Sequence, residues 1–175
     1  SRYNIAPSTV IPAIRATAEA AREAVGFQWG LVPWWSKDAA GGARLANARA
    51  EGIAKKPSFR EALRKRRCVV PASGFYEWQT VGSAKQPWYF HFREERPFVF
   101  AALWESWRSP DGVGLETCSL ITTTPNELIR PIHVRMPVIL PASAVDRWLD
   151  RAVMEPEKLE PLLIPFAAEA MVATP

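Results

Sequence analysis

The residue with the clearest capacity for proton transfer is Glu77, which interrupts an aromatic run with a charge. It lies in SGFYEWQ, where the period of a strand puts it on the face of Phe75 and Gln79, opposite Tyr76 and Trp78. If the Tyr76 and Trp78 face packs on the core, Glu77 merely faces water. If Glu77 instead lines a cleft, partial desolvation raises its pKa and allows it to carry a proton. The segment alone leaves both interpretations open.

A second proton-transfer candidate is His133 in RPIHVRMP, whose backbone is stiffened by Pro131 and Pro137. A lone histidine is more often structural than catalytic, but a place in a rigid turn beside Arg135 favours an acid–base role. The other histidine, His91, lies in WYFHF on the face opposite the neighbouring aromatic residues, which predicts a strand-surface position.

Two further segments carry groups suited to binding. In LANARAE, Asn47 and Arg49 share a face if the segment is extended, so arginine could clamp a phosphate while asparagine orients a reacting oxygen or nitrogen. In GLVPWWS, Trp34 and Trp35 follow a proline, which predicts a loop where both rings cannot be buried together. Such rings offer a stacking platform for unpaired bases, at about 1–3 kcal/mol per base. The alternative is that one ring packs on the core and the other shields it.

These groups must be positioned by short elements, because 16 prolines divide the 175 residues. With 48% hydrophobic residues the chain can form one domain with a substantial core. Residues 58–66 predict a helix with Ser58 and Glu61 as a capping box, a second short helix should follow Thr124, and a third should begin at Ser143. The predicted strands are TVIPAIRA, FQWGLVPW, RCVVPAS, GFYEWQ, WYFHF, FVFAALWESW, ETCSLITT and PVIL. This order predicts an α+β fold with a mostly antiparallel sheet that includes a barrel-like part.

Charge and composition exclude several classes of protein. The net charge is +4, but residues 55–67 hold seven basic residues against Glu61 alone, whereas residues 150–169 are mainly acidic. This asymmetry indicates a surface for a polyanion such as nucleic acid, or simply a solvated helix face. Cys68 and Cys118 lie in apolar runs and are expected to be buried thiols rather than a disulfide or a metal site. No apolar run approaches the roughly 18 residues of a membrane helix, which predicts a soluble protein. We expect neither a metal nor a cofactor, since the two cysteines and two histidines lack the short spacings of a zinc site.

Five motifs in order, RYNIAP, QWGLVPWW, NARAE, RRCVVPASGFYEW and TTTPNELIRPIHVRMPVIL, resemble the SOS response-associated peptidase (SRAP) family from Arg2 to about Leu149. The resemblance implies an α+β fold around a bifurcated sheet and barrel, with short helices and a basic groove for single-stranded DNA. It also implies a sensor of abasic sites in the DNA damage and SOS response. In that family an N-terminal cysteine condenses with the ring-opened sugar aldehyde, first as a Schiff base and then as a thiazolidine crosslink.

The resemblance also implies roles for individual residues. Glu77 matches a glutamate that assists proton transfer during imine formation, His133 matches the acid–base residue that opens the sugar ring, and Asn47 matches an asparagine that orients the N-terminal group. The implied DNA-binding positions are Arg49, Thr122 and Arg135 at the phosphates, and Trp34, Trp35 and Trp78 as aromatic braces.

One departure concerns the nucleophile, because the family begins with a Met-Cys-Gly-Arg type of sequence and Ser1 stands just before RYNIAP. Neither Cys68 nor Cys118 can serve as an α-amino thiol. We therefore expect residues 1–175 to be a single SRAP domain lacking the N-terminal segment, either by truncation or as a natural variant unable to crosslink. Three functions remain open: a crosslinking abasic-site sensor with lyase-like chemistry, a thiol autopeptidase, and a non-catalytic single-stranded nucleic-acid binding module. We expect a cytoplasmic monomer, associated with the nucleoid if bacterial.

Overall fold

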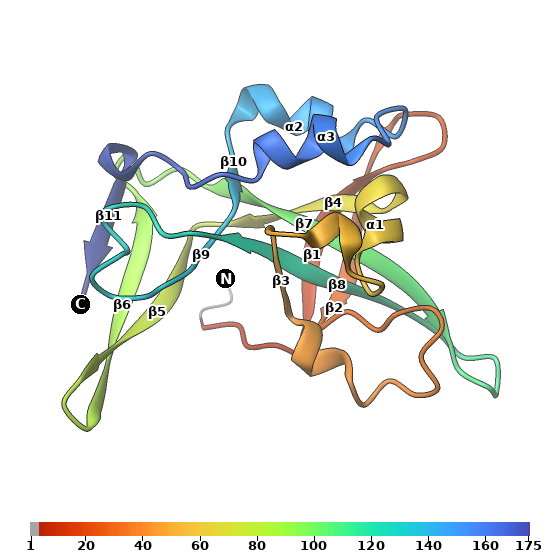
Figure 1. Cartoon of the computed structure of the whole chain (residues 1–175), viewed down its shortest axis with the longest axis horizontal. Coiled ribbons are helices and arrows are strands. Elements are labelled where there is room, and N and C mark those ends of the chain that lie inside the picture. The colour runs from red at the N-terminus through yellow and green to blue at the C-terminus, as the bar shows by residue number, and fades with distance from the viewer. Residues whose placement is uncertain (1–3) are drawn as a thin grey trace.

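The computed structural model describes residues 4–175 (Figure 1). The start of the RYNIAP motif and the expected N-terminal truncation lie outside the described residues. The strands are β1 (Val10–Ala16), β2 (Arg22–Trp29), β3 (Asn47–Arg49), β4 (Arg67–Ala72), β5 (Gly74–Val81), β6 (Ala84–Phe92), β7 (Phe98–Arg108), β8 (Gly114–Thr123), β9 (Met136–Pro137), β10 (Ile139–Leu140) and β11 (Met171–Thr174). The α-helices are α1 (Arg60–Lys65), α2 (Ala142–Leu149) and α3 (Pro156–Leu159), and the 3-10 helices are η1 (Gly42–Leu45), η2 (Ile53–Lys55), η3 (Glu160–Leu162) and η4 (Ala168–Ala170).

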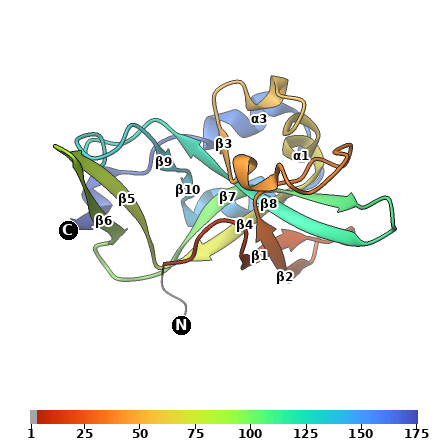
Figure 2. The same cartoon turned by 90° about the horizontal axis from the view of Figure 1, so that it is seen from below.

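Most of the strands belong to one large sheet that closes on itself. Strands β7, β4, β1, β2 and β8 pair in that order, and β7 also pairs with β8, so these strands form a ring. Only the β2–β8 and β3–β8 pairings are parallel among those described. A second sheet has the order β11-β6-β5, and its β5–β6 hairpin projects from the body (Figures 1 and 2). The prediction of an α+β fold with a mostly antiparallel sheet is confirmed.

Apolar side chains fill two cores on either side of the large sheet's strands. The first core is where the helices pack, through Leu63 of α1, Trp148 of α2 and Leu159 of α3. The second core joins the large sheet to the small one, because Phe90 of β6 and Phe27 of β2 are both fully buried in it. The small sheet is therefore anchored to the body through the face that bears Phe90.

The predicted capping box is wrong. Helix α1 begins at Arg60, its N-cap residue is Phe59, and no side chain caps it. Ser58 thus stands one residue too early to reach the free N–H groups of the first turn. Phe59 is 5% exposed, and its burial in the first core fixes the start of the helix.

The second predicted helix is also wrong, because residues 127–132 form turns. Buried Asn126 organises them: its Oδ1 accepts a hydrogen bond from the Ile129 N–H, and its backbone carbonyl accepts one from Arg130. The third helix, α2, is confirmed and begins at Ala142, one residue before the predicted start. No helix within residues 4–175 is long and apolar enough to cross a membrane.

Strand β2 lies five residues earlier in the chain than FQWGLVPW predicts and ends at Trp29. Gly30 then turns the chain with a φ of 130°, and a Cβ built there would lie 2.8 Å from the carbonyl oxygen of Gly42. Only glycine fits such a conformation and such a close approach. The turn releases the segment with the two tryptophans from the sheet.

Candidate functional site

Strand β5 exposes its aromatic face and turns its acidic face inward. Tyr76 and Trp78 are 40% and 46% exposed, whereas Phe75, Glu77 and Gln79 are partly buried. The interpretation in which Tyr76 and Trp78 pack on the core is therefore wrong. The Glu77 side chain keeps 20% of its accessible surface, so the carboxyl group is largely withdrawn from water.

The face of β5 that bears Glu77 contacts the loop that carries His133. The Glu77 Oε2 atom lies 3.4 Å from the His133 Nδ1 atom. Two positions along the strand, the Gln79 Nε2 atom donates a hydrogen bond of 3.1 Å to the Pro131 carbonyl. Gln79 is held in turn by the Trp88 indole N–H, which donates to its Oε1 at 3.1 Å. The acid and the imidazole, distant in the sequence, thus meet because two adjacent side chains of β5 bind one loop.

Burial and charge act in opposite directions on Glu77. Removal from water is the larger influence and raises the pKa of its carboxyl group, while the nearby His133 lowers it. Neutral Glu77 is therefore available at a higher pH than for an exposed glutamate, which suits a group that must both donate and accept a proton.

The backbone of Arg135 orients the His133 ring. The Nδ1 atom lies 3.0 Å from the Arg135 carbonyl oxygen and 3.3 Å from the Arg135 backbone nitrogen. The contacts of the ring that join it to other described residues all use Nδ1. Nε2 is thereby the ring nitrogen left for an incoming molecule.

The three predicted phosphate ligands lie side by side. Arg49 of β3 is the parallel partner of Thr122 of β8, and Thr122 pairs with Pro137 of β9 just beyond Arg135. The Arg135 Nη2 atom donates to the Thr122 carbonyl at 2.6 Å. The register of β3, β8 and β9 therefore brings this group together.

Glu51, which the sequence interpretation missed, occupies the guanidinium of Arg135. Its two carboxylate oxygens accept hydrogen bonds of 2.7 and 2.9 Å from Nη1 and Nη2. Arg135 lowers the pKa of Glu51, so this carboxylate stays ionised. The available signal was its place two residues after Arg49 in the same motif.

The same-face prediction for Asn47 and Arg49 is confirmed, since both are exposed while Ala48 between them is fully buried. No hydrogen bond or ion pair given for residues 4–175 joins either side chain to Glu77 or His133. The roles proposed for Asn47 and Arg49 therefore require a bound DNA strand.

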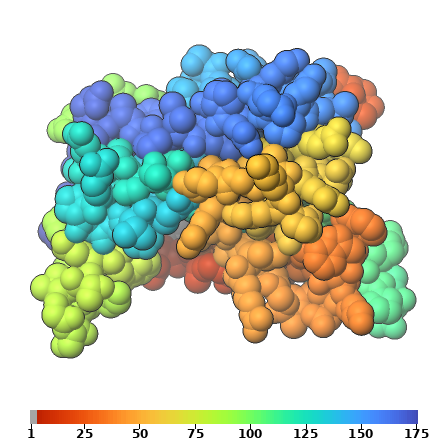
Figure 3. All heavy atoms as spheres, viewed as in Figure 1, coloured from red at the N-terminus to blue at the C-terminus, as the bar shows by residue number. Residues whose placement is uncertain are grey.

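The predicted aromatic braces are all exposed. Trp34 and Trp35 keep 62% and 52% of their surface in the loop after β2, so the alternative with one ring in the core is wrong. Trp78 stands on the projecting hairpin. Figure 3 shows a hollow at the lower edge of the molecule between the β5–β6 hairpin and the segment that follows β2.

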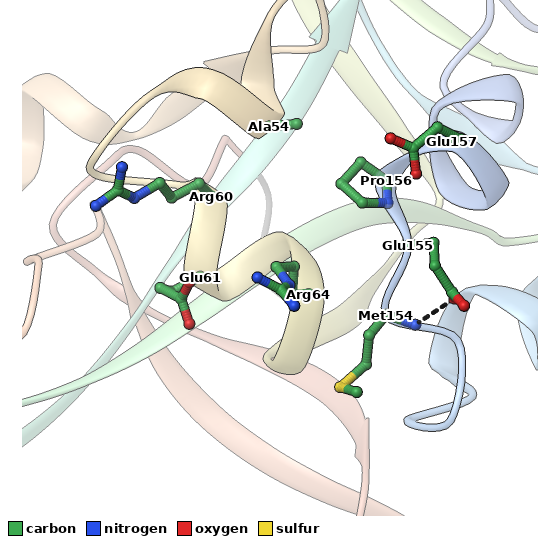
Figure 4. Close-up of a pocket in the computed structure, with 8 residues that line it drawn as sticks. All are labelled: Ala54, Arg60, Glu61, Arg64, Met154, Glu155, Pro156 and Glu157. Atoms are coloured by element: carbon green, nitrogen blue, oxygen red, sulfur yellow. Dashed lines mark hydrogen bonds between the residues drawn. The ribbon is translucent and has the colours of Figure 1, made fainter.

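The basic side chains of residues 55–67 are less available to bind a polyanion than the sequence indicates. Arg67 is buried, and Arg66 pairs with Glu105 at 2.7 Å. Arg60 and Arg64 of α1 line a groove of about 390 Å³ whose other wall is residues 154–157, with two glutamates (Figure 4). The acidic segment thus lies against the basic helix, which favours the solvated-face interpretation for α1.

The two cysteines are buried, as predicted. Burial raises the pKa of Cys118 to about 12 and raises that of Cys68 as well, so neither forms a thiolate readily. In the described part of the chain no group of three or more histidine, cysteine or acidic side chains is arranged to hold a metal ion.

The strand ring, the small sheet that bears Glu77 and the loop that bears His133 together define the class to which the protein belongs. Residues 1–175 match the family described as SOS response associated peptidase (SRAP), and the chain belongs to this family.

Among its relatives is the "Abasic site processing protein YoqW" of Bacillus subtilis, which is 42% identical over 173 residues, or 98% of this chain and 76% of the relative. Another is the "Abasic site processing protein HMCES" of Gallus gallus, which is 30% identical over 93% of this chain and 58% of the relative. A solved protein from Bacteroides thetaiotaomicron matches with a TM-score of 0.87 at 35% identity, over 95% of this chain and 73% of that one.

Proposed function

We propose that this protein processes abasic sites in single-stranded DNA and acts as a DNA-damage sensor that ends covalently linked to the lesion. The observation that carries the proposal is the Glu77–His133 contact of 3.4 Å beside the predicted phosphate ligands. The relatives named as abasic site processing proteins support the same reaction class. The attacking group would be an N-terminal cysteine, which is not among the 175 residues.

The first step is opening of the abasic sugar, which exists mainly as a closed hemiacetal. The bond between C1′ and the ring oxygen breaks, the ring oxygen takes a proton, and the C1′ hydroxyl loses one to give the aldehyde. His133 supplies the first proton from Nε2, since Nδ1 is engaged by the Arg135 backbone. A positioned imidazole suits this exchange near neutral pH.

The second step is imine formation between the aldehyde and the neutral α-amine. The amine adds to C1′, and the resulting hydroxyl leaves as water once it is protonated. Neutral Glu77 donates that proton, because burial raises its pKa. The thiol then adds to the imine carbon while the imine nitrogen takes a proton, which closes the thiazolidine. Asn47 would orient the amine.

The binding groups hold the sugar between these catalysts. Arg49 takes one flanking phosphate, while Trp34, Trp35 and Trp78 brace the DNA strand. Arg135 and the neighbouring Thr122 take a second phosphate, which displaces the Glu51 carboxylate from the Arg135 guanidinium. Fixed placement of sugar, acid and imidazole replaces encounters that solution chemistry would leave to chance.

The test uses the protein expressed from its natural start and a labelled single-stranded oligonucleotide with one abasic site. We expect an adduct that survives denaturing electrophoresis, and none with a tetrahydrofuran analogue that lacks the aldehyde. Glu77→Ala and His133→Ala should slow the adduct about 100-fold or more while leaving affinity for the analogue near that of the unmodified protein. An unchanged rate in both variants would remove the proposed roles.

Two outcomes would favour the other functions. Steeply salt-dependent DNA binding without any adduct would indicate a non-catalytic binding module. Cleavage of unrelated peptides would indicate a general thiol peptidase, whereas an autopeptidase would remove only its own initiator methionine.

A further inference from the structure

The outward face of the small sheet is an aromatic surface that the proposed chemistry does not use. Because paired residues of antiparallel strands share a face, the registers of β5, β6 and β11 define this surface, here called the outer strip. Its positions are Gly74, Tyr76, Trp78, Thr80, Lys85, Pro87, Tyr89, His91, Val172 and Thr174.

Four rings of the outer strip form a continuous row. The ring centres of Trp78 and Tyr76 lie 6.4 Å apart, those of Tyr76 and Tyr89 lie 5.1 Å apart, and those of Tyr89 and His91 lie 5.3 Å apart. Tyr76 and Trp78 are well exposed, and Tyr89 and His91 are half-buried. These rings are not required to anchor the small sheet, because Phe90 on its opposite face already packs in the second core.

Gly74 fixes the geometry of this row. A Cβ atom built on Gly74 would lie 2.4 Å from the Tyr89 hydroxyl and 2.4 Å from its Cζ, so the tyrosine ring lies directly over the glycine backbone. Any side chain at position 74 would displace the ring. The rings are therefore held in place before any ligand arrives, which lowers the entropic cost of stacking.

The charges of the outer strip suit a polyanion. None of its ten positions is an aspartate or a glutamate, and Lys85 is its one lysine or arginine. Lys85 stands beyond Trp78 on the hairpin, where its ammonium donates to Thr80 at 2.6 Å. A sheet face with aromatic rings and no acids is the arrangement on which single-stranded nucleic acids stack their bases.

The outer strip is also continuous with the candidate site. Trp78 is both a predicted brace and the end of the row, and Glu77 lies between Tyr76 and Trp78 on the other face of the strand. A single strand of DNA that leaves the Glu77–His133 site past Trp78 would next reach the rings of Tyr76 and Tyr89.

We infer that the outer strip binds the unpaired bases on one side of the abasic site, with Tyr76, Tyr89 and His91 as stacking residues beyond Trp78. This inference rests on the proposed function, because it extends the path of the same DNA strand. The occupant is a run of nucleobases, recognised by their faces and not by their sequence.

The test measures binding of single-stranded oligonucleotides by fluorescence anisotropy over a range of salt concentrations. Tyr76→Leu should weaken binding about tenfold with an unchanged salt slope, because stacking releases no counterions. Tyr76→Phe, which keeps the ring, should stay within about twofold. Val113→Ala, an exposed apolar change on the distant β7–β8 hairpin, is the matched control.

A second measurement changes the DNA and begins with the unmodified protein. Oligonucleotides carry a central tetrahydrofuran site and several base-free spacers on either its 5′ or its 3′ side. One of the two should bind the unmodified protein about tenfold more weakly, and Tyr76→Leu should cause no further loss on that one. An equal further loss from Tyr76→Leu on both oligonucleotides, or full affinity with Tyr76→Leu, would overturn the inference.

The two proposals fail in different ways. If the adduct forms but DNA affinity changes neither with Tyr76→Leu nor with the spacers, the outer-strip inference is wrong and the proposed function stands. If DNA affinity responds to both but no adduct forms, the outer-strip inference stands and the proposed chemistry is wrong.

Discussion

Replacement of Arg67 should destabilise the fold, because this buried guanidinium closes the ends of two helices. It donates to the backbone carbonyls of Leu63 and Arg64 at the end of α1, at 2.7 Å each. It also donates to the carbonyl of Trp148, at 2.6 Å, and to that of Asp150 after α2. The carbonyls of Leu63, Arg64 and Trp148 lie in the last turns of their helices, where no later helical N–H follows to bind them. The Asp150 carbonyl also accepts a hydrogen bond from the Val153 N–H, and the Arg67 side chain that serves all four is only 5% exposed.

The magnitude follows from two opposing contributions. Burial lowers the pKa of Arg67 from 12.5 to about 10, with Asp150 acting against the shift. That shift corresponds to a cost of about 3 kcal/mol for keeping the charge inside. Four hydrogen bonds from a charged donor contribute about 1.5–3 kcal/mol each, or about 6–12 kcal/mol together. Allowing water to reach some of the freed carbonyls, we expect Arg67→Met to cost about 3–5 kcal/mol.

The assay is urea unfolding at neutral pH, supported by a thermal melt. A chain of this length should lose about 6–20 °C in Tm for that change in free energy. Arg64→Met makes the same chemical change on an exposed arginine of the same helix and should stay within about 0.5 kcal/mol. If Arg67→Met cost no more than Arg64→Met, the helix-end contacts would not support the fold as argued.

Three further predictions concern the site and its sheet. Burial raises the pKa of Glu77, so the protein should lose stability as pH rises from the ordinary glutamate range through the raised value; Glu77→Gln should be the more stable protein in urea at pH 8, with the difference gone at pH 4. Arg49→Ala should weaken single-stranded DNA binding and reduce the slope of log K against log salt by about 0.7, measured by anisotropy. Gly74→Ala should cost about 1–3 kcal/mol in urea unfolding, because the new Cβ meets the Tyr89 ring.

Period-two alternation predicted the parts of the site that depend on one strand. It placed Glu77 and Gln79 on one face and Tyr76 and Trp78 on the other, and the β5 burial pattern agrees. It could not say which face turns inward, since both carry large aromatic rings. That choice is made by Phe75, which stacks on Phe90 with ring centres 5.3 Å apart in the second core.

The features that were missed depend on contacts between distant segments. The capping box at Ser58 failed because burial of Phe59 outweighed a local preference worth about 1 kcal/mol. Glu51 was missed because its partner, Arg135, is 84 positions away in sequence. Local patterns report on neighbours along the chain, whereas this ion pair exists only once β3 and β9 both pair with β8.

Strand β5 makes both proposals depend on one register. The pairing of Glu77 with Trp88 places the acid toward His133 and, in the same step, places Tyr76 opposite Tyr89 on the outer strip. A slip of one residue would exchange the two faces, sending the acid outward and the rings into the core. The register is held by burial of Phe90 and by the pairing of β6 with β11 on its other side. Damage to the β6–β11 pairing should therefore impair reaction and strand binding together, although neither strand carries a proposed catalytic residue.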